Sequence, residues 1–374
     1  MLSFEMFILI WIYCLLFHQI KGLIFYEIDQ LNYFFLLALS FNQPKFNTNT
    51  IWFSNATTFA DQNISLMLPW DIFINSKNTI YMVTSFLSPI LFWTNESDIK
   101  SPKTISGNLT LPSSIFVTTN GDIYVDNARI NGGVDKWIEE NDTWTSVFTA
   151  QSSCSDLFVD IDDSLYCSML NDHKIDKRWP NGTTTTIAGI GVAGSTLDML
   201  DRPWGIFVDI NFDLYVADSN NHRIQLFRLN QRNGITVAGN GSLRVTIKLK
   251  APSSVILDGD QYLFIVDTDN NRIIGSNENG FYCLFGCSGE GSTNDKLSNP
   301  LSMSFDSYGN IYVIDSFNTR IQKIIRSTSR GKCFFLFSHI PLSSDIEETI
   351  LKEELALFFV TRKYRNMVYC ISGR

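Results

Sequence analysis

Short apolar runs separated by turn residues fill the middle of the chain. Between Pro203 and Ile224, one run ends at Val208, a second spans Leu214–Val216 and a third begins at Arg223. β-Branched and aromatic residues in runs of this length are typical of strands, and the Asp and Asn residues between them favour tight turns. The pattern predicts three short antiparallel strands joined by two turns.

The same unit recurs along the chain with a fixed internal interval. A leading residue, Pro in five copies and Cys in one, is followed twelve residues later by an aromatic residue. Successive copies begin 42 to 49 residues apart, and a period in this range indicates a repeat architecture with one sheet per repeat. The pairs are Pro69/Tyr81, Pro112/Tyr124, Cys154/Tyr166, Pro203/Tyr215, Pro252/Phe264 and Pro300/Tyr312.

A fourth strand is predicted outside each unit. These β-branched or aromatic runs are Thr184–Gly189, Ile235–Gly239 and Phe281–Gly286, with weaker versions at Thr104–Gly107 and Trp144–Phe148, and a sixth, Asn55–Ala60, before the first unit. Because the sixth run precedes every unit, we expect it to complete the sheet of the last one. The predicted fold is all-β: a six-bladed β-propeller over residues 50–328, closed by an N-terminal outer strand that completes the last blade.

A polar signature, Asp-x-x-Asn-x-Arg-Ile, follows the aromatic marker in the last three units. Asn tolerates the left-handed backbone conformation, and Asp can accept backbone amides or pair with Arg. A motif repeated at equal spacing around a ring is architectural by default, so we expect it to brace the turn between the second and third strands. Its members are Asp218, Asn221, Arg223, Asp267, Asn270, Arg272, Asp315, Asn318 and Arg320.

Combined with Pro-x-x-Ile/Val and Leu/Ile-Tyr-Val-x-Asp, this signature resembles the NHL repeat, whose members form six-bladed β-propellers. The resemblance covers about residues 50–325 and is specific in the last three units. It weakens toward the N-terminus, where the third unit has Asp172-His173-Lys174-Ile175 in place of Asn-x-Arg-Ile. The resemblance implies a propeller and says nothing of either end of the chain.

The N-terminus predicts export. Residues 1–21 contain Met6–Phe17, an uncharged apolar block of signal-peptide length that is short for a membrane span. The alternative is an uncleaved anchor, because Glu5 replaces the usual basic residue and a second apolar patch, Tyr33–Phe41, lies in the expected linker, residues 22–49. We expect a secreted protein, or else one anchored in a membrane only through this N-terminus.

Cysteines and glycosylation sequons agree with export. Cys154 and Cys167 bracket two strands of the third unit and are expected to form a disulfide, and Cys283 and Cys287 are expected to close a small ring. The alternative is that they are buried thiols. The sequons Asn-x-Ser/Thr begin at Asn55, Asn63, Asn95, Asn108, Asn141, Asn181 and Asn240.

The net charge and the histidine content argue against several classes of function. The formal net charge of −9 makes nucleic acid an unlikely partner. NHL-like propellers include one branch of enzymes, a peptide-amidating lyase whose zinc is bound by histidines. Only His173 and His222 of the four histidines lie in the propeller region, which is too few for that site. The cysteine and histidine arrays of tripartite-motif ubiquitin ligases are absent from the sequence. No cofactor is expected.

Other six-bladed propellers are calcium-dependent hydrolases of lactones and esters. Two residues after each leading position, the innermost strands carry Asp71, Ser114, Asp156, Gly205, Ser254 and Ser302. Only Asp71 and Asp156 are acids, so they are weak candidates for a calcium site in the central channel, and we favour a structural role for both. No Gly-x-Ser-x-Gly, His-Glu-x-x-His or phosphate-binding loop occurs.

The hypothesis from sequence is therefore a non-catalytic scaffold that binds a protein or a small extracellular ligand, with the calcium-dependent hydrolase as the alternative. Partner binding is expected on three long connections, Ile190–Arg202, Asn240–Ala251 and Ser288–Asn299. Residues 329–374 are expected to be a C-terminal tail, partly helical between Ser344 and Val360.

Overall fold

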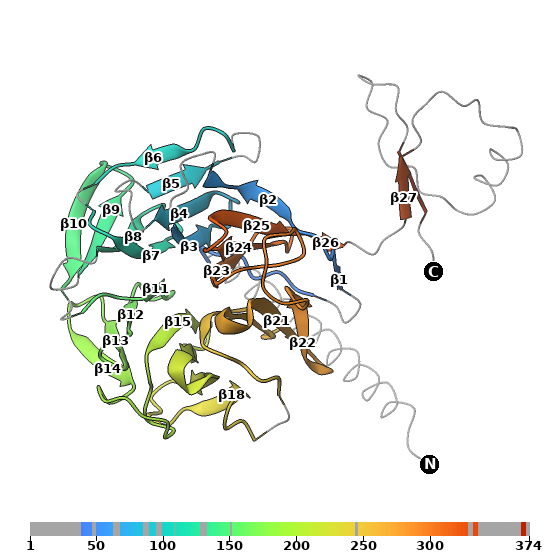
Figure 1. Cartoon of the computed structure of the whole chain (residues 1–374). Helices are drawn as coiled ribbons and strands as arrows, with labels where there is room; N and C mark the ends of the chain where they lie inside the picture. The colour runs from blue at the N-terminus through green and yellow to red at the C-terminus, as the bar shows by residue number, and fades with distance from the viewer. Residues whose placement is uncertain are drawn as a thin grey trace, which may run out of the picture.

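The computed structural model describes residues 39–46, 50–62, 68–84, 90–94, 99–107, 109–127, 133–149, 152–243 and 246–327, and the backbone of 332–335 and 368–371. Six four-stranded antiparallel sheets are arranged around a ring, and each is one blade of a propeller (Figure 1). The all-β, six-bladed fold expected from the sequence is confirmed.

The blades follow the repeats in order. Blades 1 to 3 are β3 (Pro69–Ile74), β4 (Ile80–Thr84), β5 (Ile90–Trp93) and β6 (Lys103–Ile105); β7 (Pro112–Val117), β8 (Ile123–Asn127), β9 (Val134–Ile138) and β10 (Thr143–Phe148); and β11 (Asp156–Val159), β12 (Leu165–Met169), β13 (Lys174–Arg178) and β14 (Thr184–Ala188). Blades 4 to 6 are β15 (Pro203–Val208), β16 (Leu214–Asp218), β17 (Arg223–Phe227) and β18 (Ile235–Gly239); β19 (Pro252–Leu257), β20 (Leu263–Asp267), β21 (Arg272–Asn277) and β22 (Gly280–Phe285); and β23 (Pro300–Phe305), β24 (Ile311–Asp315), β25 (Arg320–Ile324) and β2 (Thr57–Ala60).

Blade 6 combines the two ends of the propeller region. Its strand order is β2-β25-β24-β23, and β2 pairs antiparallel with β25, with Thr58 opposite Gln322. A second short pair, β1 (Ile51–Trp52) with β26 (Arg326–Ser327), lies next to it along the chain. The N-terminal strand therefore joins the sheet built from the last repeat.

Burial explains why the second strand of each blade is a nearly continuous apolar run. All five residues of β16, β20 and β24 are buried, because neighbouring blades cover both faces of the sheet. The glycine that ends the fourth strand has a steric cause. At Gly239, where φ is +83°, an added Cβ would lie 2.3 Å from the carbonyl oxygen of His222.

Both expected cysteine pairs, Cys154–Cys167 and Cys283–Cys287, are disulfide-bonded. The first is buried, with Cys154 in the place that proline takes in the other repeats. These bonds fit an oxidising compartment. Four sequon asparagines, Asn55, Asn141, Asn181 and Asn240, are exposed, whereas Asn63, Asn95 and Asn108 lie outside the described residues.

Several expectations for the chain ends fall outside the described residues, namely the leader in residues 1–21 and the helix between Ser344 and Val360. Within residues 329–374, the described backbone forms a two-stranded sheet of β27 (Lys332–Phe335) and β28 (Val368–Ile371). In the part of the chain that the structure describes, no helix is long and apolar enough to cross a membrane.

Candidate functional site

The propeller has two unlike faces. We call the side where the inner strands begin, at the leading residues, the loop face, and the side where they end the turn face. On the turn face, each inner strand meets the second strand in a tight turn. At Asp160, one carboxylate oxygen accepts the backbone N–H groups of Asp162 and Ser164, both at 2.9 Å, which stabilises that turn. Asp209, Asp258 and Asp306 repeat this arrangement.

Asp71, the first channel candidate from the sequence, lies on the inner strand of blade 1 and is buried. Its Oδ1 accepts hydrogen bonds from the amide of Ile72 at 2.8 Å and from the hydroxyl of Ser302 in blade 6 at 2.6 Å. Its Oδ2 accepts the amide of Ile115 in blade 2 at 2.9 Å. Asp71 therefore joins blades 6, 1 and 2.

Asp156 has the same role two blades further on. Its Oδ1 accepts the amide of Leu157 at 2.8 Å and the hydroxyl of Ser114 in blade 2 at 3.2 Å, and its Oδ2 accepts the amide of Ile206 in blade 4 at 2.7 Å. Burial raises the pKa of Asp71, and burial followed by the charge of Asp71 raises the pKa of Asp156 well above its usual range. The two acids form a hydrogen-bonded belt from blade 6 to blade 4.

In blade 4, a glycine occupies the position that Asp71 and Asp156 occupy in blades 1 and 3. At Gly205, an added Cβ would lie 2.5 Å from the carbonyl oxygen of Ser253 and 2.7 Å from the Cα of Ser254. The inner strand of blade 5 thus approaches too closely for any side chain. Gly205 stands at the same repeat position as Asp71 and Asp156, so blade 4 cannot contribute a metal-binding side chain there.

Calcium fits this belt poorly. Calcium takes six to eight oxygen ligands, but all four carboxylate oxygens of Asp71 and Asp156 already accept hydrogen bonds from the protein. Among the described residues, no group of three or more His, Cys, Asp or Glu side chains is placed to hold a metal ion. The residues present therefore do not fit a calcium ion.

Both ends of the channel are covered. On the loop face, the half-buried rings of Trp70 and Trp204, from opposite blades 1 and 4, lie 6.1 Å apart between centroids. On the turn face, Phe41 packs against Phe158 and Phe207, each at 5.4 Å between centroids. Between Phe41 and the acid belt lies a cavity of about 70 Å³. That is room for water, whereas small-molecule sites commonly measure about 300–1,000 Å³.

The NHL-like signature holds the long loops of the loop face. In blade 4, Asp218 accepts Nε of Arg223 at 2.7 Å and the side-chain amide of Asn221 at 2.9 Å. The arginine's remaining nitrogens donate to the carbonyl oxygens of Ser195, Thr196 and Met199 at 2.8 to 3.0 Å. The signature was expected to brace only the turn after the second strand; it also fixes the Ile190–Arg202 loop, because the guanidinium fork reaches three carbonyls.

The same arrangement recurs in blade 6. Arg320 pairs with Asp315 at 2.6 Å and donates to the carbonyl oxygens of Ser292, Thr293 and Lys296 at 2.8 to 3.0 Å. In blade 5, Arg272 pairs with Asp267 at 2.8 Å, and among the described residues its Nη2 donates to the carbonyl of Lys248 at 2.8 Å. Asn270 and Asn318 donate to the same carboxylates as the arginines.

Comparison with known proteins identifies the repeat. Residues 200–227 match the NHL repeat family, and this stretch holds Pro203, Tyr215, Asp218 and Arg223. The protein is a six-bladed β-propeller that contains an NHL repeat in its fourth blade. A comparison with curated protein sequences finds no match.

Solved structures similar to this NHL propeller have diverse roles. An auxiliary nutrient binding protein from Bacteroides ovatus has a TM-score of 0.57 at 17% sequence identity, over 77% of this chain and 76% of that one. A streptogramin B lyase has 0.54 at 14%, over 73% and 97%. A protein provisionally assigned as a gluconolactonase has 0.53 at 12%, over 78% and 95%. At these identities, the likeness shows the fold alone.

The long loops of the NHL propeller expose apolar side chains on the loop face. Ile190 and Val192, in the first long loop, are 50% and 57% exposed, and Leu243, in the second, is fully exposed. Phe317, in the turn next to the third long loop, is 68% exposed, and its amide donates to the carbonyl of Ser298 at 3.1 Å. These residues lie on the same face of the propeller as Trp70 and Trp204.

The two propeller histidines occupy equivalent turns of neighbouring blades on the loop face. Nδ1 of His173 accepts the amide of Arg202 at 3.1 Å, and Nδ1 of His222 accepts the amide of Ala251 at 3.0 Å. Each histidine therefore holds the end of a long loop.

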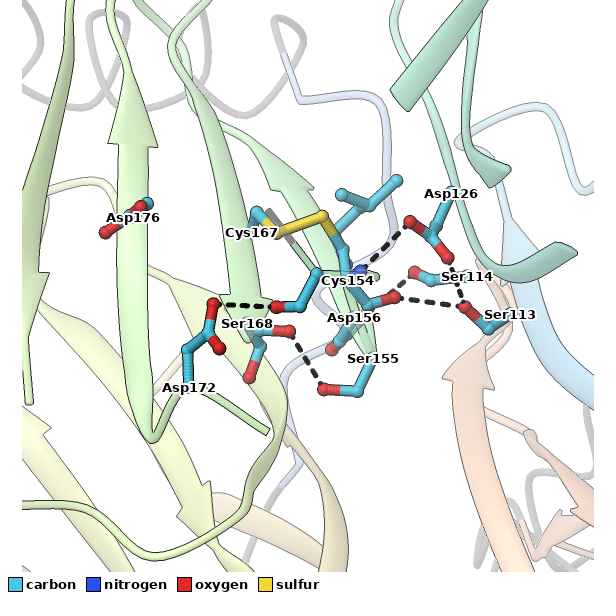
Figure 2. The surroundings of a disulfide bond; sticks show 12 residues. Ser113, Ser114, Asp126, Cys154, Ser155, Asp156, Cys167, Ser168, Asp172 and Asp176 are labelled. Atoms are coloured by element: carbon cyan, nitrogen blue, oxygen red, sulfur yellow. Dashed lines mark hydrogen bonds between the residues drawn. A yellow bond between two sulfur atoms is a disulfide. The ribbon is translucent and has the colours of Figure 1, made fainter. Parts of the chain in front are cut away.

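A buried acid lies beside the disulfide of blade 3. Figure 2 shows Asp126 between Ser113 and Cys154: its Oδ2 accepts the Ser113 hydroxyl at 2.6 Å and its Oδ1 the Cys154 amide at 2.9 Å. Burial raises the pKa of Asp126 to about 6. Sequence reasoning missed this residue, although an acid within the apolar second strand of blade 2, where the other repeats have Val, Ser, Ala or Ile, is a visible signal.

Proposed function

We propose that this protein is a secreted, non-catalytic binding module whose partner, a protein or a small extracellular ligand, docks on the loop face. The observation that carries this proposal is the Trp70–Trp204 pair at the centre of that face, with long loops held by buried arginines around it. Tryptophan and arginine are enriched at the centres of binding sites, and ordered loops lose little entropy when a partner binds.

Two further features support a binding role. Exposed apolar residues such as Val192, Leu243 and Phe317 give the loop face the kind of surface that partners cover. The acids of the channel are used in hydrogen bonds between blades, and the channel is covered at both ends. The likeness to a nutrient binding protein is compatible with this role.

Secretion is part of the same proposal. It rests on the predicted leader in residues 1–21, the two disulfides and the exposed sequon asparagines. N-terminal sequencing of the protein recovered from the medium of expressing cells tests it: a new N-terminus near residue 22 supports secretion by a cleaved leader. Retention in the membrane fraction with Met1 intact supports the anchored form.

The competing proposal is a calcium-dependent hydrolase of lactones or esters with its site in the channel, which requires calcium to displace the hydrogen bonds that Asp71 and Asp156 now accept. Its support is the buried pair Asp71 and Asp156, whose pKa values are raised, together with the likeness to a protein provisionally assigned as a gluconolactonase. Incubation with calcium and a panel of lactones and esters separates the two. Chelator-sensitive turnover that is lost in Asp71→Ala and Asp156→Ala favours the hydrolase, and absence of turnover favours the binding module.

A phage-displayed library of linear peptides tests the loop face directly. Peptides selected on the wild-type protein are expected to bind Trp204→Ala at least tenfold more weakly, a loss of about 1.4 kcal/mol or more. Ile210→Ala, on the turn face, is the matched control and should leave their affinity unchanged, and Trp204→Phe should retain part of it. Selected peptides that bind wild type and Trp204→Ala equally well would contradict the assignment to this face.

A further inference from the structure

The segment of residues 39–46 contacts every blade on the turn face. The carbonyl of Ser40 accepts the amide of Ser76 beside blade 1 at 2.8 Å, and the carbonyl of Pro44 accepts the amide of Gly259 beside blade 5 at 3.0 Å. Phe41 lies against one phenylalanine in each of blades 2, 3 and 4, and the Asn42 side chain reaches blade 6; the partners are Phe116, Phe158, Phe207 and the carbonyl of Phe305. Residues 39–46, part of the predicted linker 22–49, are therefore packed against the propeller.

Two aromatic anchors and one amide give these contacts specificity. Phe41 enters the ring of channel phenylalanines, and Phe46 packs against Phe264 and Phe305 at 5.3 and 5.5 Å between centroids. Between the anchors, the Asn42 amide donates to the carbonyl oxygens of Asn75 and Phe305, both at 3.0 Å, which bridges blades 1 and 6. Aromatic anchors in pockets with main-chain hydrogen bonds between them are the contacts that an extended peptide makes with its receptor.

The ring of blades is closed without this segment. β2 pairs with β25 in blade 6, and Ser302 and Ser304 bond across the seam to Asp71 and to the amide of Ile74, at 2.6 and 3.1 Å. Residues 39–46 therefore have the contacts of a bound peptide rather than of a strand in a sheet. The exposed Lys45–Asp260 pair adds little energy but matches the segment to its groove in charge.

We propose that this channel mouth is a peptide-binding site that accepts residues 39–46 of a second copy of the chain. The complementarity to Phe41, Asn42 and Phe46 is present in the structure, and a second copy supplies the identical segment, which is the basis of exchange between protomers. The chain's own segment competes at a high effective concentration, so binding in trans requires that the segment in cis be weakened or displaced.

The test uses full-length protein with Phe41→Ala and a fluorescein-labelled octapeptide with the sequence of residues 39–46. Anisotropy is expected to show saturable binding to Phe41→Ala that is at least tenfold tighter than binding to the wild type, and no binding of an octapeptide with Ala in place of the first Phe. Asn42→Ala, which removes two hydrogen bonds without a large cavity, is expected to bind the octapeptide with intermediate affinity.

The second arm tests the source of the segment. Tagged Phe41→Ala protein and untagged wild type are unfolded in urea and refolded together, so that the wild-type segment leaves its own site; the tagged variant should then retain the wild-type chain, and excess octapeptide should release it. Either variant folded but unable to bind the octapeptide would overturn the site, as would failure of both variants to fold, because the segment would then be an integral part of the propeller. Octapeptide binding without retention of wild type would overturn the assignment to a second copy.

Discussion

The loop face and the turn face show how one repeated unit produces two different surfaces. On the loop face, long connections are held by buried arginines and leave apolar side chains exposed. On the turn face, aspartates stabilise short turns, and the N-terminal segment covers the channel through Phe41 and Phe46. The hairpins are alike, so the difference comes from the length of the connection at each end. On the turn face, the short turns themselves restrict the backbone. On the loop face, hydrogen bonds from side chains must hold the long connections in place.

The loop face itself has two halves. In blades 4 to 6, an Asp–Arg pair ends the second strand, but the equivalent position holds Thr84, Asn127 and Met169 in blades 1 to 3. Asn127 retains one function of the missing acid, since its side-chain oxygen accepts the amide of Thr110, as Asp218 accepts that of Asp201. The Cys154–Cys167 disulfide and the buried Asp126 lie in the half without the arginines.

The largest expected effect on stability comes from removing a buried arginine that holds a long loop. In Arg223→Ala, the buried carboxylate of Asp218 loses its cationic partner, and three carbonyls of the first long loop lose their donor. Breaking a buried pair of this kind costs about 3–5 kcal/mol. We expect that loss in the free energy of unfolding from urea titration, with faster hydrogen exchange in residues 194–199.

Arg272→Ala is the matched control in the next blade. The Arg272 side chain is 22% exposed, against 5% for Arg223, so its removal is expected to cost less, about 2 kcal/mol. If the two variants lose equal stability, the burial of the arginine side chain does not determine how much it stabilises the protein. If Arg223→Ala leaves hydrogen exchange in its loop unchanged, the loop face is not held as we describe.

Much of the fold follows from the sequence because it depends on local repetition. The twelve-residue interval places two strands of each blade, and glycines such as Gly239 end the fourth strand because a Cβ would meet the backbone. The position of Asn55–Ala60 before the first unit indicates the sheet to which it belongs. These signals are periodic, so each copy supports the reading of the others.

The sites were harder to predict from the sequence because they depend on contacts between distant segments. The pairing of Trp70 with Trp204 requires blades 1 and 4 to face each other across the channel, which neither residue reveals alone. One missed signal was present in the sequence: Gly-Ser-Thr-x-Asp occurs in residues 194–198 and 291–295, the two loops whose carbonyls bind Arg223 and Arg320. The role of Phe41 has no repeated counterpart and is visible only in the structure.

A smaller effect is expected from pH in the half of the loop face without arginines. Burial raises the pKa of Asp126 from 3.8 to about 6, so the folded state holds this proton more tightly than the unfolded state. The resulting stability is fully present below about pH 4 and is lost as the pH rises through about 6. A shift of about two units corresponds to about 3 kcal/mol.

Asp126→Asn isolates this contribution, because the amide oxygen can still accept the Cys154 amide and cannot ionise. Urea unfolding at several pH values should show a flatter decline for the variant than for wild type between about pH 4 and pH 7. Asp71 and Asp156, whose pKa values are also raised, act in the same direction in both proteins, so the difference between the two profiles is the informative quantity. Parallel profiles would show that Asp126 does not titrate in this range.

The smallest expected effect concerns the histidine that holds the second long loop. His222→Ala leaves the amide of Ala251 without its side-chain acceptor and keeps a residue without polar atoms at φ +55°, so we expect a loss of about 1–2 kcal/mol. Blade 5 supplies the matched substitution: at the equivalent turn, Asn271 has φ +54°, and its Oδ1 accepts the amide of Asn299 at 2.7 Å. His222→Asn is therefore expected to retain wild-type stability in urea, and slow hydrogen exchange at Ala251. If both variants lose the same stability, the acceptor at this position does not hold the loop, and its rigidity comes from other contacts, such as those of Asp267 and Arg272.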